Sequence, residues 1–579
     1  MSQQIVTDRT LEALKIAAAW PGADRATLVT LATRLAATGA DEEGYRYFGQ
    51  LAASQSDQVL PLALAGYFQV RSGADIRAGL ARLDDAANRD LGPAQYFRGL
   101  ALAGLPAEVG RAEQAIADLE FVLAVRDQFP SPMIRAVYHG LAAAYETAGQ
   151  HDRAARAAAD SGLSAAPVGT RLEFGGGWMN AADGFHMSSP TIAEVAPGIR
   201  VAHGYDFGDF AFVSTGDGVV AIDAGTAEHR VRAALADAGI DAADVSHVLL
   251  THAHFDHVGG IGALVGPATR VIAQHGFTDE LRRQRGHVFP FRYFTGNAPG
   301  LGSGDGHSAA DALAVDQPVA SVTSMSVAGT QFVLYPTTGG ETSDALMVYL
   351  PESGVLFLGD VMMPYLGAPF FAEGSPEGLL DALRLIVELN PRVLVHGHPV
   401  LTELFTVASV PGVLAALTEL RDVAVGRIRG GQTLAEVLDA SVLPAALREH
   451  PVAVIPYLAI SEHFVQRLYQ QHSGYWQPDG QGLEPIGPAD RAAALDLLAG
   501  SRPEQFAAAA RTLLAQRDAA LALEIASAGL VSHPGRADLA QLRTEALYRL
   551  MERHQLQDPF RFLIYGELAG VELGPVATA

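Results

Sequence analysis

Apolar residues follow two different patterns along this chain, and the changes between them divide it into three parts. Residues 1–168 are rich in Ala and Leu at helical spacing, which predicts a helical region. Over residues 190–405, short apolar runs with many β-branched residues alternate with helical stretches. The Ala-rich helical pattern returns over residues 406–579. The pattern therefore predicts an α+β multidomain protein in which helical regions flank a mixed central region.

Glycine, serine and proline mark the boundary between the first two parts and predict a linker over about 168–190. Before this boundary, the order of small residue, Tyr, Gly, Ala, Leu and Pro from Leu141 to Pro167 resembles one tetratricopeptide repeat. Only this stretch matches well, so an irregular helical bundle is the alternative. Such repeats bury their apolar faces by stacking, and a partner protein or another subunit is an expected ligand of this region.

The expected strands of the central region are short and rich in Val, Ile, Leu and Phe. They lie at residues 198–201, 211–214, 218–225, 245–250, 270–273, 332–335, 346–350, 355–358 and 393–395. A helix is expected at about 227–238. Strands that alternate with helices in this way predict a layered sheet-and-helix structure.

A cluster of histidines follows the expected strand at 245–250, in the stretch Thr-His-Ala-His-Phe-Asp-His-Val-Gly-Gly at residues 251–260. His252 and His254 point the same way if the extended backbone continues beyond the strand. Zinc accepts imidazole nitrogen and carboxylate oxygen, and two adjacent ions can share a bridging water. Chance histidines on a polar loop are the alternative, but this spacing after a buried strand favours a metal site.

Composition excludes several other chemistries. The net charge of −24 argues against a nucleic-acid partner, which requires clustered Lys and Arg. The absence of cysteine excludes disulfides and thiolate ligands, and Lys15, the only lysine, cannot serve a phosphate-binding loop. No stretch has the length of a membrane-spanning helix and no secretory leader is visible, so we expect a cytoplasmic protein without a membrane span.

The central region resembles the metallo-β-lactamase superfamily, whose αβ/βα sandwich carries metal ligands on loops at strand ends. The matching residues are Asp223 in Ile-Asp-Ala-Gly, His252, His254, Asp256 and His257 in the cluster, Asp360 in Leu-Phe-Leu-Gly-Asp, and His398 in Val-His-Gly-His-Pro. The resemblance implies two divalent ions, with zinc favoured. His252 and His254 would hold the first ion with a third ligand; Asp256, His257 and His398 would hold the second, and Asp360 would bridge.

Three positions of this ligand set have alternative interpretations. Most members of the superfamily have a histidine as the third ligand of the first ion, whereas the equivalent stretch here, Thr-Thr-Gly-Gly-Glu-Thr, offers Glu341. Carboxylate oxygen binds zinc, although Glu341 would otherwise be a surface acid on a glycine-rich turn. His396 competes with His398, and the Gly-His order favours His398. Asp223 is expected to support the ligands through hydrogen bonds rather than to bind an ion.

The glutamate narrows the resemblance to the alkyl sulfatases of this superfamily. The segment 271–277 followed by 292–297 is similar to their substrate-side insertion, and residues 469–485 with the helices beyond are similar to their dimerisation domain. The resemblance implies hydrolysis of an alkyl sulfate, or a similar anionic ester, by a metal-bound hydroxide that Asp256 orients and deprotonates. It also implies a homodimer formed through residues 406–579, and substrate contacts from Arg292, Tyr293 and Asn297.

Two departures from the alkyl sulfatase pattern leave other reactions open. The segment 360–371 is apolar and lacks the arginine that clamps sulfate in that family, and the bridging acid is Asp360 where a glutamate is usual. Arginines at 282, 283 and 285 are candidates for the missing charge, or a solvated helix face. A lactonase, a β-lactamase and a thioesterase are the alternatives among hydrolases, and a mononuclear iron dioxygenase is a more distant one.

Overall fold

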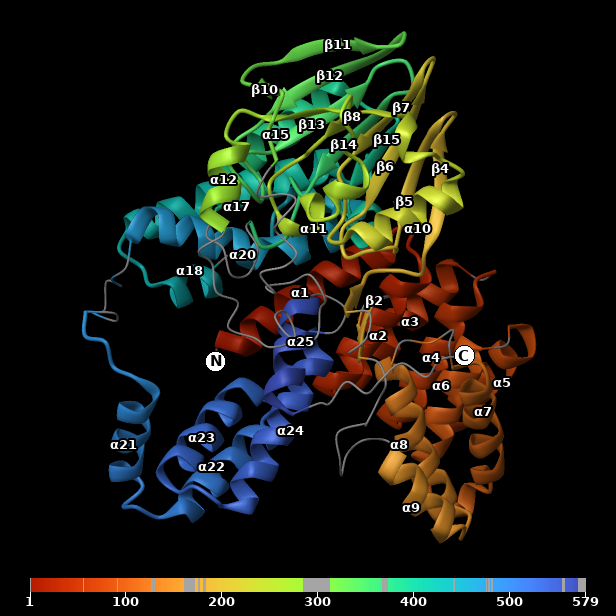
Figure 1. Cartoon of the computed structure of the whole chain (residues 1–579). Helices are drawn as coiled ribbons and strands as arrows, with labels where there is room; N and C mark the ends of the chain where they lie inside the picture. The colour runs from red at the N-terminus through yellow and green to blue at the C-terminus, as the bar shows by residue number, and fades with distance from the viewer. Residues whose placement is uncertain are drawn as a thin grey trace.

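The computed structural model describes residues 2–55, 57–90, 92–126, 129, 131–160, 172–174, 177–180, 184–284, 313–366, 373–440, 443–474, 476, 480, 483–554 and 558–570. Two packed β-sheets stand at one end of the molecule, and helical layers from both ends of the chain lie beneath them (Figure 1). In the described residues, no helix has both the length and the hydropathy needed to cross a membrane. The fold is thus the expected α+β architecture, with a sandwich between helical regions.

The N-terminal region is a stack of helices, each packed against its neighbour in the chain. They are α1 (Ser2–Ala19), α2 (Arg25–Thr38), α3 (Asp41–Ser54), α4 (Val59–Ser72), α5 (Ile76–Arg89), α6 (Pro93–Ala103), α7 (Ala112–Ala124), α8 (Ser131–Thr147) and α9 (His151–Asp160). Helices α4 and α5 pack so closely at Gly66 that a Cβ there would lie only 2.8 Å from the carbonyl oxygen of Gly79. One apolar core runs through the stack.

The sandwich contains a seven-stranded sheet in the order β10-β9-β8-β7-β6-β5-β4 and a five-stranded sheet in the order β11-β12-β13-β14-β15. The first comprises β4 (Thr191–Ala196), β5 (Ile199–His203), β6 (Phe210–Thr215), β7 (Gly218–Ile222), β8 (Val245–Leu249), β9 (Arg270–Gln274) and β10 (Gln317–Val319). The second comprises β11 (Thr323–Val327), β12 (Thr330–Pro336), β13 (Leu346–Leu350), β14 (Val355–Gly359) and β15 (Val393–His396). Inward-facing side chains of both sheets, among them Val220, Leu249, Phe332 and Val348, form one core.

Helices cover the outer face of each sheet. The seven-stranded sheet packs against α10 (Glu228–Ala238), α11 (Phe255–Val258) and α12 (Phe277–Gln284) through a second apolar core. On the other side lie α15 (Pro376–Leu389), α16 (Pro399–Leu404) and α17 (Val410–Arg429). Strands β7, β8, β9 and β10 are parallel to one another, as are β14 and β15, so several strand ends open at the same edge.

The C-terminal region has two helical layers. Helices α17, α18 (Leu434–Ala440), α19 (Ala446–Glu449) and α20 (Val454–Ser473) share a core with the five-stranded sheet, and Ala13 and Ala17 of α1 join it. Beyond them, a separate group extends away from the sandwich (Figure 1). It comprises α21 (Pro488–Leu498), α22 (Pro503–Ala515), α23 (Ala519–Ser532), α24 (Ala537–His554) and α25 (Pro559–Leu568).

The expected linker was wrong for part of residues 168–190. Three short antiparallel strands form a small sheet there: β1 (Leu172–Phe174), β2 (Gly177–Asn180) and β3 (Gly184–His186). Strands of three or four residues among glycines carry too few apolar positions for their periodicity to be recognised.

Candidate metal centre

The predicted ligands lie together where strands of both sheets end. Asp223 follows β7, the histidine cluster follows β8, Asp360 follows β14, and His398 lies two residues beyond β15. Glu341 lies on the connection between β12 and β13. A backbone hydrogen bond of 2.7 Å from the N–H of Leu346 to the carbonyl oxygen of Thr251 ties the two sheets together at this edge. The sandwich therefore brings residues far apart in sequence to one place.

A first cluster consists of His252, His254 and Glu341, all buried. Glu341 Oε2 lies 3.3 Å from His252 Nε2 and 3.1 Å from His254 Nδ1. The three atoms point at one another, in the arrangement of a tridentate site for a cation such as zinc.

A second cluster consists of Asp256, His257, Asp360 and His398, also buried. His398 Nε2 lies 3.0 Å from Asp360 Oδ2 and 3.4 Å from Asp256 Oδ2. His257 Nε2 lies 3.5 Å from the same Asp360 oxygen. The two clusters adjoin, because the rings of His252 and His257 have centroids 4.2 Å apart. The residues thus form two neighbouring sites, the first with three donors and the second with four.

The outward nitrogen of three of these histidines has a hydrogen-bond partner that fixes the ring. Asp223 Oδ2 lies 2.9 Å from His257 Nδ1, and Glu373 Oε2 lies 2.9 Å from His254 Nε2. The carbonyl oxygen of Phe207 lies 2.8 Å from His398 Nδ1. Such partners keep the proton on the outward nitrogen and leave the other nitrogen free to bind a metal.

Several of the inner atoms lack such partners. Among the described residues, the buried atoms without a hydrogen bond include His252 Nε2, His257 Nε2, Glu341 Oε2 and Asp360 Oδ1. Burial raises the pKa of Glu341 to about 7, because a carboxylate loses its hydration there. Buried polar atoms without partners are costly, so donors that converge in this way fit two divalent cations.

A glycine makes room for the second cluster. A Cβ at Gly397 would lie 2.2 Å from Asp360 Oδ1 and 2.5 Å from the His257 ring. The Gly between the two histidines of Val-His-Gly-His is therefore required by the site itself.

His396 is placed outside both clusters. Its Nε2 lies 3.0 Å from the carbonyl oxygen of Phe405, and burial lowers its pKa to about 4. A neutral histidine that bonds to the backbone has a structural role, so the structure favours His398 over His396 as the ligand.

Glu373 was missed by the sequence analysis. It stands alone in Phe-Ala-Glu-Gly-Ser, with no apolar strand before it and no other ligand nearby in sequence. Only the chain path that brings the segment before α15 against His254 reveals it.

The predicted substrate-contact residues Arg292, Tyr293 and Asn297 lie outside the described residues. Two arginines of the neighbouring helix α12 are exposed and paired with acids of that helix, Arg282 with Asp279 and Arg283 with Glu280. This pairing favours the solvated helix face over an anion clamp for these two residues.

Glu341 offers a direct test of the first cluster. Glutamine keeps the size of the side chain but is a much weaker ligand, so Glu341→Gln should lower occupancy of the first cluster while the second remains loaded. Elemental analysis of metal per chain measures this, with Glu352→Gln, an exposed position, as the control. Unchanged stoichiometry would show that Glu341 binds no ion.

Comparison with known proteins agrees with this geometry. Residues 204–398 match the family model of the metallo-beta-lactamase superfamily, and residues 433–560 match the model for alkyl sulfatase dimerisation. A linear primary-alkylsulfatase from Pseudomonas sp. (strain ATCC 19151) is 26% identical over 325 residues, which cover 51% of this chain. The chain therefore carries a metallo-β-lactamase region over residues 204–398, followed by a region similar to the alkyl sulfatase dimerisation domain over residues 433–560.

The likeness of the chain to these relatives is partial. The match spans 61% of the length of the primary-alkylsulfatase. The structure of the stereoselective inverting sec-alkylsulfatase Pisa1 from Pseudomonas sp. superposes with a TM-score of 0.53 at 18% identity, over 67% of this chain and 66% of that one. A double mutant of the same sec-alkylsulfatase gives a TM-score of 0.52 at 19% identity. These structures support the fold of the sandwich and the helices that follow it.

Proposed function

We propose that this protein is a binuclear metal-dependent hydrolase of alkyl sulfates or similar anionic esters. The observation that carries the proposal is the pair of adjoining buried clusters, one with three donors and one with four. The match to the alkyl sulfatase dimerisation model and the likeness to a linear primary-alkylsulfatase support the choice of a sulfuric ester as the scissile group. Histidine and carboxylate donors without thiolates are compatible with zinc, which we propose for both sites.

We assign the ligands to two ions. His252, His254 and Glu341 would hold one ion, and Asp256, His257 and His398 the other, with Asp360 between them. Such ions, when bound, activate water and offset negative charge on an ester. Asp256 Oδ2 would orient the attacking water and accept its proton. Thr251, Asp223 and Glu373 would hold the histidine rings in place.

Part of the apolar segment 360–371 is described by the structure and packs in the core. Met362 and Met363 are buried in the core shared by α15, α17 and α20, so they pack rather than line a tail pocket. For the sulfate group, Arg292, Tyr293 and Asn297 remain our proposal from the family resemblance.

Substrate chain length provides the decisive experiment. Burial of each methylene contributes about 0.8 kcal/mol, so kcat/KM for linear alkyl sulfates should rise about fourfold per added carbon until the apolar site is filled. Purified, metal-loaded protein would be assayed against alkyl sulfates of increasing length, lactones, β-lactams and phosphodiesters. Inert alkyl sulfates together with rapid turnover of a neutral lactone would overturn the alkyl sulfatase proposal.

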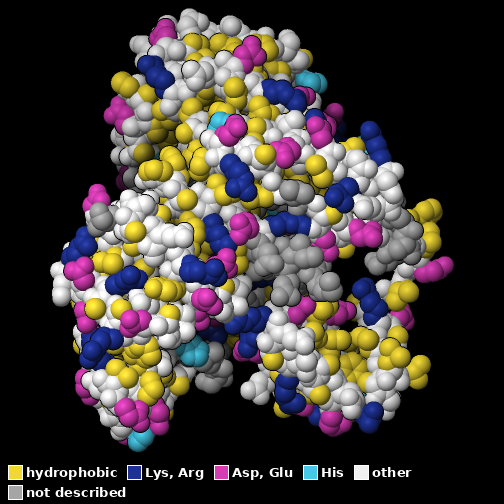
Figure 2. Space-filling view, turned by 180° about the vertical axis from the view of Figure 1, so that it is seen from behind, with side chains coloured by type: hydrophobic (Ala, Val, Ile, Leu, Met, Phe, Trp, Pro, Cys, Tyr) yellow, Lys and Arg dark blue, Asp and Glu magenta, His cyan; other side chains and the backbone are white. Residues whose placement is uncertain are grey.

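We also propose that the protein is a homodimer that pairs through residues 406–579. Figure 2 shows hydrophobic side chains gathered over the α21–α23 region, where Leu497 and Leu498 are 81% and 84% exposed. Isologous pairing is the commonest way to cover such a surface. Light scattering should give twice the chain mass, and Leu497→Glu with Leu498→Glu should favour the monomer. Val322→Glu, at an exposed position on the sandwich, is the control; a monomeric wild-type protein would contradict the prediction.

A further inference from the structure

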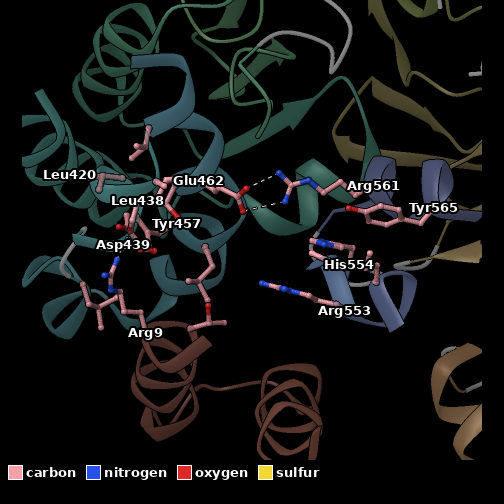
Figure 3. A pocket seen from close by; sticks show the side chains of 18 residues that line it. Arg9, Leu420, Leu438, Asp439, Tyr457, Glu462, Arg553, His554, Arg561 and Tyr565 are labelled. Carbon is pink, nitrogen blue, oxygen red and sulfur yellow. Dashed lines mark hydrogen bonds and ion pairs between the residues drawn. The ribbon is translucent and has the colours of Figure 1, made fainter. Parts of the chain in front are cut away.

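A cavity of about 340 Å³ lies between three parts of the chain that are far apart in sequence (Figure 3). Helix α1 forms one wall, helices α17, α18 and α20 form a second, and helices α23, α24 and α25 form the third. Its volume is in the range of small-molecule binding sites. None of its lining residues belongs to the metal clusters, so the cavity is separate from the centre described above.

Part of the wall is aliphatic. Leu420, Leu438, Leu443, Leu458, Val465 and Leu550 line it. The side chains come from α17, α20 and α24 and from the α18 region, so the apolar surface is assembled only in the folded chain. A cavity with this lining favours a ligand that has an apolar chain.

The remaining wall carries an excess of positive charge. Arg9, Arg553 and Arg561 line the cavity with only two carboxylates, Asp439 and Glu462. Arg561 binds Glu462 with contacts of 2.7 and 3.3 Å, and Asp439 acts electrostatically on Arg9. Glu462 is thereby occupied by Arg561, and the negative charge of Asp439 acts on Arg9 rather than on Arg553.

Arg553 is left without a carboxylate within the part of the chain that the structure describes, and its guanidinium points into the open space of Figure 3. A second guanidinium, that of Arg34, donates a hydrogen bond of 3.2 Å to the carbonyl oxygen of Arg553. Burial, and secondarily the charge of Arg553, lowers the pKa of Arg34 to about 10. Burial and the neighbouring arginines lower the pKa of His554 to about 4, so this side chain adds no positive charge to the cavity wall.

We infer that this cavity is a second binding site, which takes an amphiphilic anion with its head at Arg553 and its aliphatic chain against the leucines. A guanidinium binds carboxylate, sulfate and sulfonate groups through charge-assisted hydrogen bonds. The aliphatic wall accommodates the chain. The inference does not rest on the proposed hydrolysis, because it uses no residue of the metal centre.

Calorimetry with the full-length protein tests this inference. The ligands are decane-1-sulfonate and decanoate below their micelle concentrations, with decan-1-ol as the neutral probe of equal chain length. The sulfonate has no hydrolysable ester. Each titration is repeated after chelation of metals, because binding at the metal centre would be lost and binding in the cavity retained. We expect both anions to bind the chelated protein, and decan-1-ol to bind at least 10-fold more weakly.

Two variants assign the site. Arg553→Gln should weaken binding of both anions by 10-fold or more and leave decan-1-ol unchanged. Ala435→Phe, at an exposed position of the rim, should weaken all three ligands by filling the cavity. Arg511→Gln, on the exposed face of α22, is the matched control and should change nothing. The inference would be overturned if Arg553→Gln bound the anions as tightly as the wild type does. It would also be overturned if Ala435→Phe converted a dimer to monomers, because this would show that a second copy of the chain covers the cavity.

Discussion

Alanine at His252 or at Asp256 is expected to reduce turnover by at least about 10²–10⁴-fold, the range that loss of a single proton acceptor causes. His252→Ala removes one of three donors of the first cluster, and Asp256→Ala removes both a donor of the second cluster and the proposed proton acceptor. His252 lies on the loop after β8 and Asp256 lies in the first turn of the short helix α11, so neither belongs to an apolar core. The helical regions should therefore keep their folded circular dichroism spectrum.

Metal content separates this effect from general damage. In each variant, the cluster that contains the substituted residue should lose metal before the other cluster does. Elemental analysis of protein loaded at limiting zinc measures this loss. His247→Ala is the matched control, because His247 lies on β8 and binds Ser246 rather than either cluster. Near-normal turnover with full metal content in either variant would show that the two-ion assignment is wrong. A single iron per wild-type chain would favour the dioxygenase alternative.

The core strands of the sandwich could be predicted from sequence because they are buried on both faces. Strands such as β7 and β14 read as continuous apolar runs, with β14 fully buried. The edge strands β4, β10 and β11 could not, because they mix polar and apolar residues over three to six positions. The boundary strands β1–β3 could not be predicted for the same reason.

The ligands were predictable to the extent that each carries its own local signal. The His and Asp residues after β8, and His398 beside its glycine, stand in recognisable stretches. Glu373 does not, since its role arises only from the contact with His254 across 119 positions of sequence. The packing of α1 against α20 and the cavity beneath it are likewise products of tertiary contact, which no local pattern encodes.

The second large effect is expected from Asp223→Asn, a substitution that touches no metal-facing atom. Asp223 accepts hydrogen bonds of 2.7 Å from both the N–H and the hydroxyl of Thr251, and its Oδ2 lies 2.9 Å from His257 Nδ1. Its backbone has φ of 60°, a conformation that asparagine also adopts readily. The backbone and the side-chain shape should therefore be preserved.

Asparagine nevertheless reverses the two hydrogen bonds made at Oδ2, the one from the Thr251 hydroxyl and the one from His257 Nδ1. If its oxygen accepts from the Thr251 N–H, its NH₂ group faces His257 Nδ1, which must then act as an acceptor. The proton of the neutral ring moves to Nε2, the atom that faces Asp256 and Asp360 and has no other partner. A histidine in the wrong tautomer cannot donate that lone pair to a cation, and loss of such a supporting carboxylate typically costs 10–100-fold in metal affinity or activity.

The readouts distinguish a tautomer effect from lost stability. Asp223→Asn should lower the affinity of the second cluster for zinc by about 10–100-fold while the first cluster binds normally. Burial is outweighed by the carboxylates of Asp256, Asp360 and Asp223, which raise the pKa of His257 in the metal-free protein. In ¹⁵N-detected NMR at a pH above this pKa, where the ring is neutral, the His257 proton should shift from Nδ1 to Nε2. Asp244→Asn, at an exposed acid just before β8, is the matched control and should change neither measurement. Wild-type zinc affinity in Asp223→Asn would contradict the role of Asp223, because it would mean that His257 keeps its metal-binding tautomer without the carboxylate.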